Sequence, residues 1–229
     1  MRRCRPFVLA WFVCLVTGST AAGQSLPPPF DLGDSTLRVL IARHGETAAN
    51  AERRIVGQMD VPLNARGREQ SLRLRDTLRG VVIDAIYASP LTRSLTTAQT
   101  VADGRTVRVL PTLVERNQGA YQGQLVSDRF SQRSLDPTDD LDGGETMLQV
   151  RRRATAALEL MRKAHPRGTI VVVGHALLNQ MLLASIIGLS TENAMKIGQA
   201  NDEVYLAEVS DRRPPSLWKL ISPTSFGEL

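Results

Sequence analysis

The sequence predicts an α/β protein, a three-layer α/β/α sandwich around a mainly parallel β-sheet. Short apolar runs alternate with stretches of helical pattern, which is typical of this architecture. The run Ile170-Val171-Val172-Val173 is continuous and β-branched, as in interior strands that are covered on both faces. Two histidines, His44 and His175, come just after apolar runs of this kind. Because ligands bind at the carboxyl ends of parallel strands, the fold itself predicts where a site lies.

The pattern places the elements in order along the chain. Residues 37–42, 85–88 and 169–173 are predicted strands. Residues 64–78 form a predicted helix capped by Asn64, and residues 147–161 carry one apolar stripe at helical spacing. Residues 176–187 are apolar nearly all round, which predicts a buried helix. The tail, at 203–209 and 217–221, predicts two further strands.

The N-terminus has the order of a secretory signal peptide. Basic residues come first, an apolar run covers residues 7–16, and small residues follow. We therefore expect cleavage after Ala22 or Gly23 and a periplasmic or secreted protein. An uncleaved leader would instead anchor the chain, and we expect no other membrane contact. The predicted division is a signal peptide at 1–23, a Pro-rich linker at 24–35 and one globular domain at 36–229.

Cysteine content and charge exclude several classes of function. Cys4 and Cys14 both lie in the predicted leader, so neither disulfides nor thiolate metal sites are expected in the mature domain. Removal of residues 1–23 takes away three arginines and no acid, which lowers the formal charge from +5 to +2. The basic run Arg151-Arg152-Arg153 falls on a predicted helix and is expected to be a solvated face. We expect no nucleic-acid partner, no metal and no cofactor, and composition does not indicate the oligomeric state.

The positions of the three histidines indicate which of them belong to a candidate site. His44 and His175 follow predicted parallel strands and should meet at one edge of the sheet. His165 precedes Pro166 at the end of a predicted helix, so we expect a surface or capping residue there.

The segment Arg43-His44-Gly45-Glu46-Thr47, with Asn50 three residues further on, resembles the signature of the histidine phosphatase superfamily. The similarity is to the branch that contains cofactor-dependent phosphoglycerate mutases and small broad-specificity phosphatases. It continues through Gly57, Asp60, Pro62-Leu63, Gly67 and Gln70, and then through Ser89 to Ala98, Glu115 and Gly174-His175. The resemblance implies a phosphoglycerate mutase-like fold and identifies residues 36–229 as a histidine phosphatase domain.

The same resemblance implies a catalytic set. His44 is expected to attack phosphorus and form a phosphohistidine that water then cleaves. Arg43 and Arg93 cannot lose their protons and offer paired donors to phosphate, and a protonated His175 would add a third positive donor. Glu115 is expected to protonate the leaving oxygen.

Predictions also concern residues and segments around this catalytic set. Asn50 could serve as a helix-entry residue, but the resemblance implies that it donates to the phosphate. Glu46 and Glu145 begin predicted helices and are left out of the catalytic set. The polar segment 127–142, with its acids, is predicted to be a lid whose charge disfavours a second phosphate. Ala176-Leu177-Leu178 departs from the small residues that the family commonly has after its second histidine, which puts the substrate pocket in doubt.

The function that these residues favour is hydrolysis of a small phosphomonoester. One alternative is phosphoglycerate mutase activity, suggested by Glu115-Arg116 with Gly119 and Gly123. The leader and the short segment from Glu115 to His175 argue against it. A second alternative is a non-catalytic module that binds a phosphorylated ligand. It predicts the loss of a catalytic group, and none is missing.

Overall fold

A computed structural model describes residues 36–210 and 214–220 of the 229-residue chain. The predicted leader and linker lie outside the described residues. The strands are β1 (Leu37–Arg43), β2 (Ala85–Ala88), β3 (Val107–Val109), β4 (Gly168–Gly174), β5 (Val204–Val209) and β6 (Ser216–Leu220). The helices are α1 (Ala48–Ala51), α2 (Ala65–Thr77), α3 (Thr92–Ala102), α4 (Asp128–Ser134), α5 (Met147–Ala164), α6 (Ala176–Ile187) and α7 (Thr191–Ala194). Two 3₁₀ turns, η1 (Pro111–Leu113) and η2 (Gly119–Tyr121), complete the described elements.

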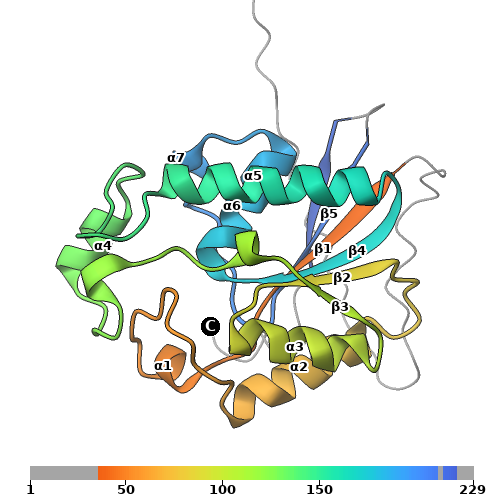
Figure 1. Cartoon of the computed structure of the whole chain (residues 1–229), viewed down its shortest axis with the longest axis horizontal. Coiled ribbons are helices and arrows are strands. Elements are labelled where there is room, and N and C mark those ends of the chain that lie inside the picture. The colour runs from red at the N-terminus through yellow and green to blue at the C-terminus, as the bar shows by residue number, and fades with distance from the viewer. Residues whose placement is uncertain (1–35, 211–213, 221–229) are drawn as a thin grey trace, which may run out of the picture.

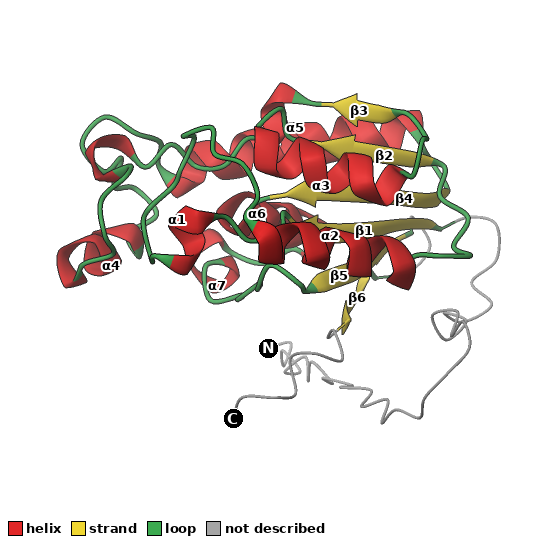
Figure 2. Cartoon of the chain, turned by 90° about the horizontal axis from the view of Figure 1, so that it is seen from below, coloured by secondary structure: helices red, strands yellow, loops and turns green. Residues whose placement is uncertain are grey.

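The strands form one sheet in the order β3-β2-β4-β1-β5-β6 (Figure 2). Strands β1 to β4 run parallel to one another, whereas β5 is antiparallel to both β1 and β6. Helices α5 and α6 cover one face of the sheet and α2 and α3 the other (Figure 1). The predicted three-layer sandwich with a mainly parallel sheet is therefore confirmed.

The β-branched run of β4 shows why this strand is interior. Ile170 and Val172 pack with α5 and α6, whereas Val171 and Val173 pack with α3. All four are fully buried, as a strand covered on both faces requires. Adjacent parallel strands β1, β4 and β2 therefore end at the same edge, and the loops that follow them share one region.

The other predicted elements are also observed, with small shifts at their ends. Asn64 caps α2, its side chain accepting a hydrogen bond from the Gly67 N–H at 2.8 Å. Helix α6 buries eight of its residues, as its apolar sequence predicted. The antiparallel direction of β5 and the short strand β3 were not predicted. None of the described helices combines the length and the apolar composition that a bilayer crossing requires.

Candidate active site

His44 and His175 meet because β1 and β4 are neighbours in register. Arg43 pairs with Gly174, so each histidine is the first residue after its strand. The His44 N–H donates to the Gly174 carbonyl at 3.1 Å, and the two ring centroids lie 5.1 Å apart. Both side chains are buried. The predicted meeting of the two histidines at one sheet edge is confirmed.

The hydrogen bonds of His44 define its tautomer. Its Nδ1 lies 2.8 Å from the Gly45 carbonyl, which can only accept, so Nδ1 carries the proton. The Nε of Arg93, which can only donate, lies 3.2 Å from His44 Nε2. Burial, aided by the charges of Arg43 and Arg93, holds the pKa of His44 well below its usual 6.5. The ring is therefore neutral, with a lone pair on Nε2.

Arg93 is held rigidly beside that lone pair. Its two terminal nitrogens donate to the carbonyls of Met59 and Gly57, each at 2.7 Å. The side chain is 1% exposed, and burial lowers its pKa to about 10, which leaves the guanidinium charged at neutral pH. Asp60 fixes the start of α3 by accepting from the Thr92 N–H at 2.7 Å. The loop that follows α1 thus positions both Arg93 and its helix.

Arg43 is anchored by the loop that precedes β5. Its Nη1 donates to the Gln199 carbonyl at 2.8 Å. The Gln199 side chain is tied to the Ile41 carbonyl and to Asn179, and Asn201 donates to the His44 carbonyl at 2.7 Å. Sequence reasoning missed Gln199 and Asn201, since no motif or periodicity marks them.

His175 has two buried ring nitrogens. Neither Nδ1 nor Nε2 makes a hydrogen bond within the described structure, and the ring is fully buried. Such groups in a native protein call for a ligand or another explanation. Burial, and then the neighbouring His44 and arginine charges, holds the pKa of His175 well below 6.5. The neutral ring offers one N–H donor, and an adjacent phosphate dianion would favour its protonation. That a protonated His175 adds a third positive donor stays a prediction.

Glu115 reaches the site from the loop between η1 and η2. Its Oε1 accepts from the amides of Arg116 at 2.8 Å and Leu178 at 3.2 Å, and its Oε2 accepts from the Leu177 amide at 3.3 Å. The carboxyl is buried, and its charge acts on both Arg43 and Arg93. In Ala176-Leu177-Leu178, the backbone at the start of α6 therefore holds the acid, while the Leu178 side chain enters the core.

Comparison with known proteins identifies the family. A model of the histidine phosphatase superfamily, branch 1, matches residues 39–219, which is most of the chain. The chain belongs to the histidine phosphatase superfamily.

Similar proteins are named as phosphatases or as phosphoglycerate mutases. Phosphoserine phosphatase 1 of Hydrogenobacter thermophilus is 27% identical over 187 residues, covering 77% of this chain and 89% of that protein. The "Probable phosphoglycerate mutase GpmB" of Enterobacter sp. (strain 638) is 33% identical over 163 residues, covering 67% and 76%. The crystal structure of the alpha-ribazole phosphatase from Shigella flexneri has a TM-score of 0.73 at 25% identity, covering 81% and 96%.

Asn50 has a structural role at the start of α1. Its Oδ1 accepts from the Thr47 N–H at 3.2 Å and from the Thr47 hydroxyl at 3.0 Å, completing the capping box of α1. Any contact with a phosphate must therefore come from Nδ2. The predicted donation to phosphate stays a prediction.

The two acids left out of the catalytic set have structural partners. Glu46 accepts from the Asn64 side chain at 2.8 Å, and its own N–H donates to Gln70. Glu145 forms an ion pair with Arg153 at 3.0 Å. The Arg153 side chain is only 16% exposed, so the prediction that Arg151-Arg152-Arg153 is a solvated face is wrong for its third member. The cause is tertiary, because the partners of Arg153 lie in other segments.

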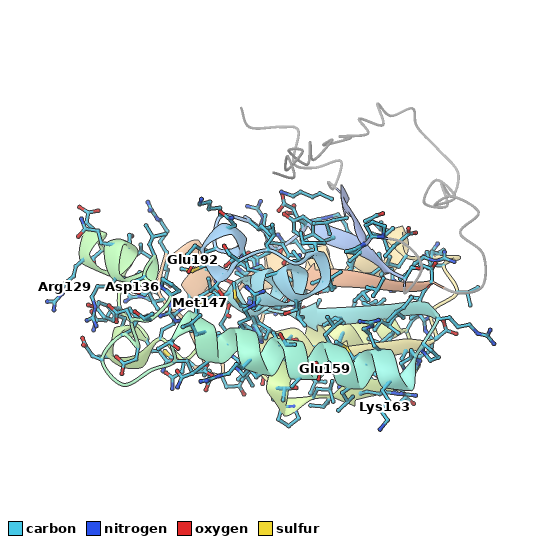
Figure 3. All side chains as sticks on the ribbon, turned by 90° about the horizontal axis from the view of Figure 1, so that it is seen from above. Arg129, Asp136, Met147, Glu159, Lys163 and Glu192 are labelled. Carbon is cyan, nitrogen blue, oxygen red and sulfur yellow. The ribbon has the colours of Figure 1, made fainter. Side chains whose placement is uncertain are left out.

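The predicted lid contains α4 and extends beyond the edge of the sheet, as the labelled Arg129 and Asp136 show (Figure 3). Arg133 pairs with Asp139 and with Asp142, each at 2.7 Å. These acids are therefore partly neutralised within the lid, which weakens the predicted repulsion of a second phosphate.

The opposite edge of the sheet carries the third histidine. His165 is the C-cap of α5, as expected, and its ring lies 3.0 Å from the Tyr87 hydroxyl. A hollow of about 320 Å³, lined in part by Leu37, His165 and Val209, lies at this edge, and none of the candidate catalytic residues lines it. Among the residues that the structure describes, no group of three His, Cys, Asp or Glu side chains is placed to hold a metal ion.

Proposed function

We propose that this chain hydrolyses small phosphomonoesters through a phosphohistidine on His44, with Glu115 as the proton donor. The observation that carries the proposal is the pair of hydrogen bonds that leaves the Nε2 lone pair on a neutral His44 and holds the Arg93 guanidinium 3.2 Å from it. A nucleophile beside a fixed cation is the arrangement that attack on a dianionic phosphate needs.

The reaction has two balanced steps. The first step uses Glu115 in its protonated form: Nε2 of His44 bonds to phosphorus, the ester P–O bond breaks, and Glu115 gives its proton to the leaving oxygen. In the second, Glu115 takes a proton from water as the water oxygen attacks phosphorus, the P–N bond breaks, and phosphate leaves. Arg43, Arg93 and His175 hold the phosphoryl oxygens throughout.

A phosphoester panel tests the proposal. Phosphate release is measured with chelator present, on alkyl and aryl phosphomonoesters that include phosphoserine and alpha-ribazole 5'-phosphate, which the names of relatives suggest. We expect release from at least one member. Release from none of them, or release only with added metal, would overturn the proposal.

Phosphoglycerate mutase activity is the second candidate, because proteins named as mutases are among the relatives. In that reaction the phosphohistidine returns its phosphoryl group to a second hydroxyl instead of to water. A coupled mutase assay run beside the phosphate-release assay separates the two. Mutase turnover faster than phosphate release would reverse the ranking.

We also propose that the protein works outside the cytoplasm, in the periplasm or secreted. The support is the signal-peptide order of residues 1–23. N-terminal sequencing of the protein from its native cells is expected to start just after Ala22 or Gly23. A chain that still starts at Met1 would contradict this proposal without affecting the catalytic one.

A further inference from the structure

Arg153 lies beneath the loop that carries Glu115. It projects from α5, which starts at Met147 and runs along one face of the sheet to Lys163 and beyond (Figure 3). Its guanidinium donates five hydrogen bonds. Two form a fork with the Glu145 carboxylate, both at 3.0 Å, and three reach the carbonyls of Thr112, Val114 and Glu115. One arginine therefore binds three carbonyls within four consecutive residues.

Glu145 binds the backbone that follows Glu115 in the chain. Besides Arg153, its Oε2 accepts from the Asn117 N–H at 2.9 Å and from the Gln58 side chain at 3.3 Å. Arg153 holds the carbonyl of Glu115 itself at 2.9 Å, and Glu145 holds the backbone two residues later. The ion pair thus fixes the chain on both sides of the acid.

Gln58 joins this ion pair to the phosphate-binding arginine. Its side-chain amide donates to the Glu115 carbonyl at 2.8 Å. Its neighbours Gly57 and Met59 supply the two carbonyls that hold Arg93. The segment around Gln58 therefore contacts both Glu115 and Arg93, and it fixes the position of one relative to the other.

The acid loop needs such support. Residues 114–118 belong to no helix or strand, so their backbone groups have no regular ladder to fix them. Fork-shaped arginine contacts to carboxylates and carbonyls supply directional bonds that a lysine cannot reproduce. A displacement of about 1 Å at a proton donor is enough to cost on the order of 10²-fold in rate.

We propose that Arg153, paired with Glu145, is a positioning residue that sets where the Glu115 carboxyl meets the leaving oxygen. The proposal rests on the proposed function, since it presumes that Glu115 is the proton donor. Arg153 does not touch substrate. Arg153 contributes to the protonation of the leaving group, so its substitution should change how the phosphorylation rate depends on the leaving group.

The chain supplies a matched control. Arg152 is the adjacent residue of the same helix, is exposed, and has the same charge. If Arg153 served only the fold or the net charge, a change at either arginine would act equally on all substrates. A positioning role predicts that only Arg153 changes the dependence on the leaving group.

The experiment compares a poor with a good leaving group in the phosphorylation step. Rates of phosphohistidine formation are measured on glycerol 2-phosphate, whose alkoxide needs a proton, and on p-nitrophenyl phosphate, whose phenolate leaves without one. Wild type, Arg153→Lys, Glu145→Gln and Arg152→Lys are compared, and Glu115→Gln shows the pattern expected when the acid is absent. The measured quantity is the ratio of the two rates.

For Arg153→Lys and Glu145→Gln we expect the alkyl rate to fall at least about tenfold more than the aryl rate, in the direction of Glu115→Gln. Arg152→Lys should keep the wild-type ratio. Equal loss on both substrates, or no loss, would overturn the inference. If both variants fail to fold, Gln58→Met, which removes only the amide contacts of Gln58, gives the same comparison with the same two outcomes. Failure of wild type to form phosphoenzyme from either substrate would instead reject the proposed function.

Discussion

Arg93 directs its Nε–H at the Nε2 of His44 across 3.2 Å, so the arginine proposed to bind phosphate and the proposed nucleophile are already in contact. The other nitrogens of Arg93 are fixed by two backbone carbonyls, which leaves the guanidinium little freedom to turn away. A phosphoryl group that accepts this N–H in place of Nε2 would free the Nε2 lone pair for attack and would be held by the same cation. This contact connects nucleophilic attack with charge stabilisation.

The first prediction concerns that contact. Arg93→Lys keeps the charge but loses the fork, so two carbonyls lose their donors and the cation no longer sits beside Nε2. We expect kcat/KM for phosphomonoesters to fall by about 10²–10³-fold. Arg108→Lys, at the opposite edge, should stay within about twofold of wild type. Equal effects of the two substitutions would contradict the assigned role.

The second prediction concerns the nucleophile. His44→Ala should reduce turnover by a factor on the order of 10⁴ or more and abolish the phosphoenzyme, because it removes the nitrogen proposed to attack phosphorus. Rapid-quench labelling should give an acid-labile, alkali-stable adduct in wild type. His165→Ala is the control, since His165 caps a helix at the far edge, and it should still be labelled. A stable phosphoenzyme in His44→Ala would reject the mechanism.

The third prediction links the buried histidines to stability. Burial lowers the pKa of His44 and of His175 well below 6.5 in the folded chain, whereas the unfolded chain protonates them near 6.5. As the pH falls below 6.5, the unfolded state therefore binds more protons, and the free energy of unfolding decreases. The loss is up to about 1.4 kcal/mol per pH unit for each histidine until the folded pKa is reached.

Denaturant unfolding between about pH 7 and about pH 5 measures this effect. A variant with both His44→Gln and His175→Gln should lose less stability over the same range than wild type. Identical losses would show that other groups cause the pH dependence.

The fourth prediction concerns Gly45, next to the nucleophile. A Cβ at this position would lie 2.2 Å from the carbonyl oxygen of Gly67, which is backbone and cannot move aside. Gly45→Ala should therefore lower the free energy of unfolding by at least about 2 kcal/mol and displace His44. Gly198→Ala meets no atom within 4 Å and should be neutral in the same melt. Equal stabilities would mean that the loop relaxes freely.

The fifth prediction concerns Gln199, which sequence reasoning missed. Its side chain is buried and bonds to the Ile41 and Glu203 carbonyls and to Asn179. Gln199→Leu leaves these groups unpaired and should cost at least about 2 kcal/mol in unfolding free energy. Gln124→Leu, at an exposed glutamine, should cost less than about 0.5 kcal/mol. A neutral Gln199→Leu would show that water or a local shift replaces the bonds.

The sequence by itself determined the sandwich and the meeting of two histidines. The reason is that both follow from local pattern: β-branched runs predict interior parallel strands, and parallel neighbours end at one edge. Arg93 and Glu115 came from the resemblance to a family and not from spacing, and the structure brings both to that edge.

Only the tertiary structure decided which side chains support these groups. Arg153 stands in a basic run that predicts a solvated face, yet its partners are carbonyls about 40 residues earlier in the chain. Gln58, Gln199 and Asn201 carry no pattern at all. Contacts of this kind depend on where loops meet in space, and a hydrogen bond from a side chain to a distant carbonyl leaves no periodic trace in the sequence. The candidate catalytic groups could therefore be named from the sequence, whereas the residues that support them could not.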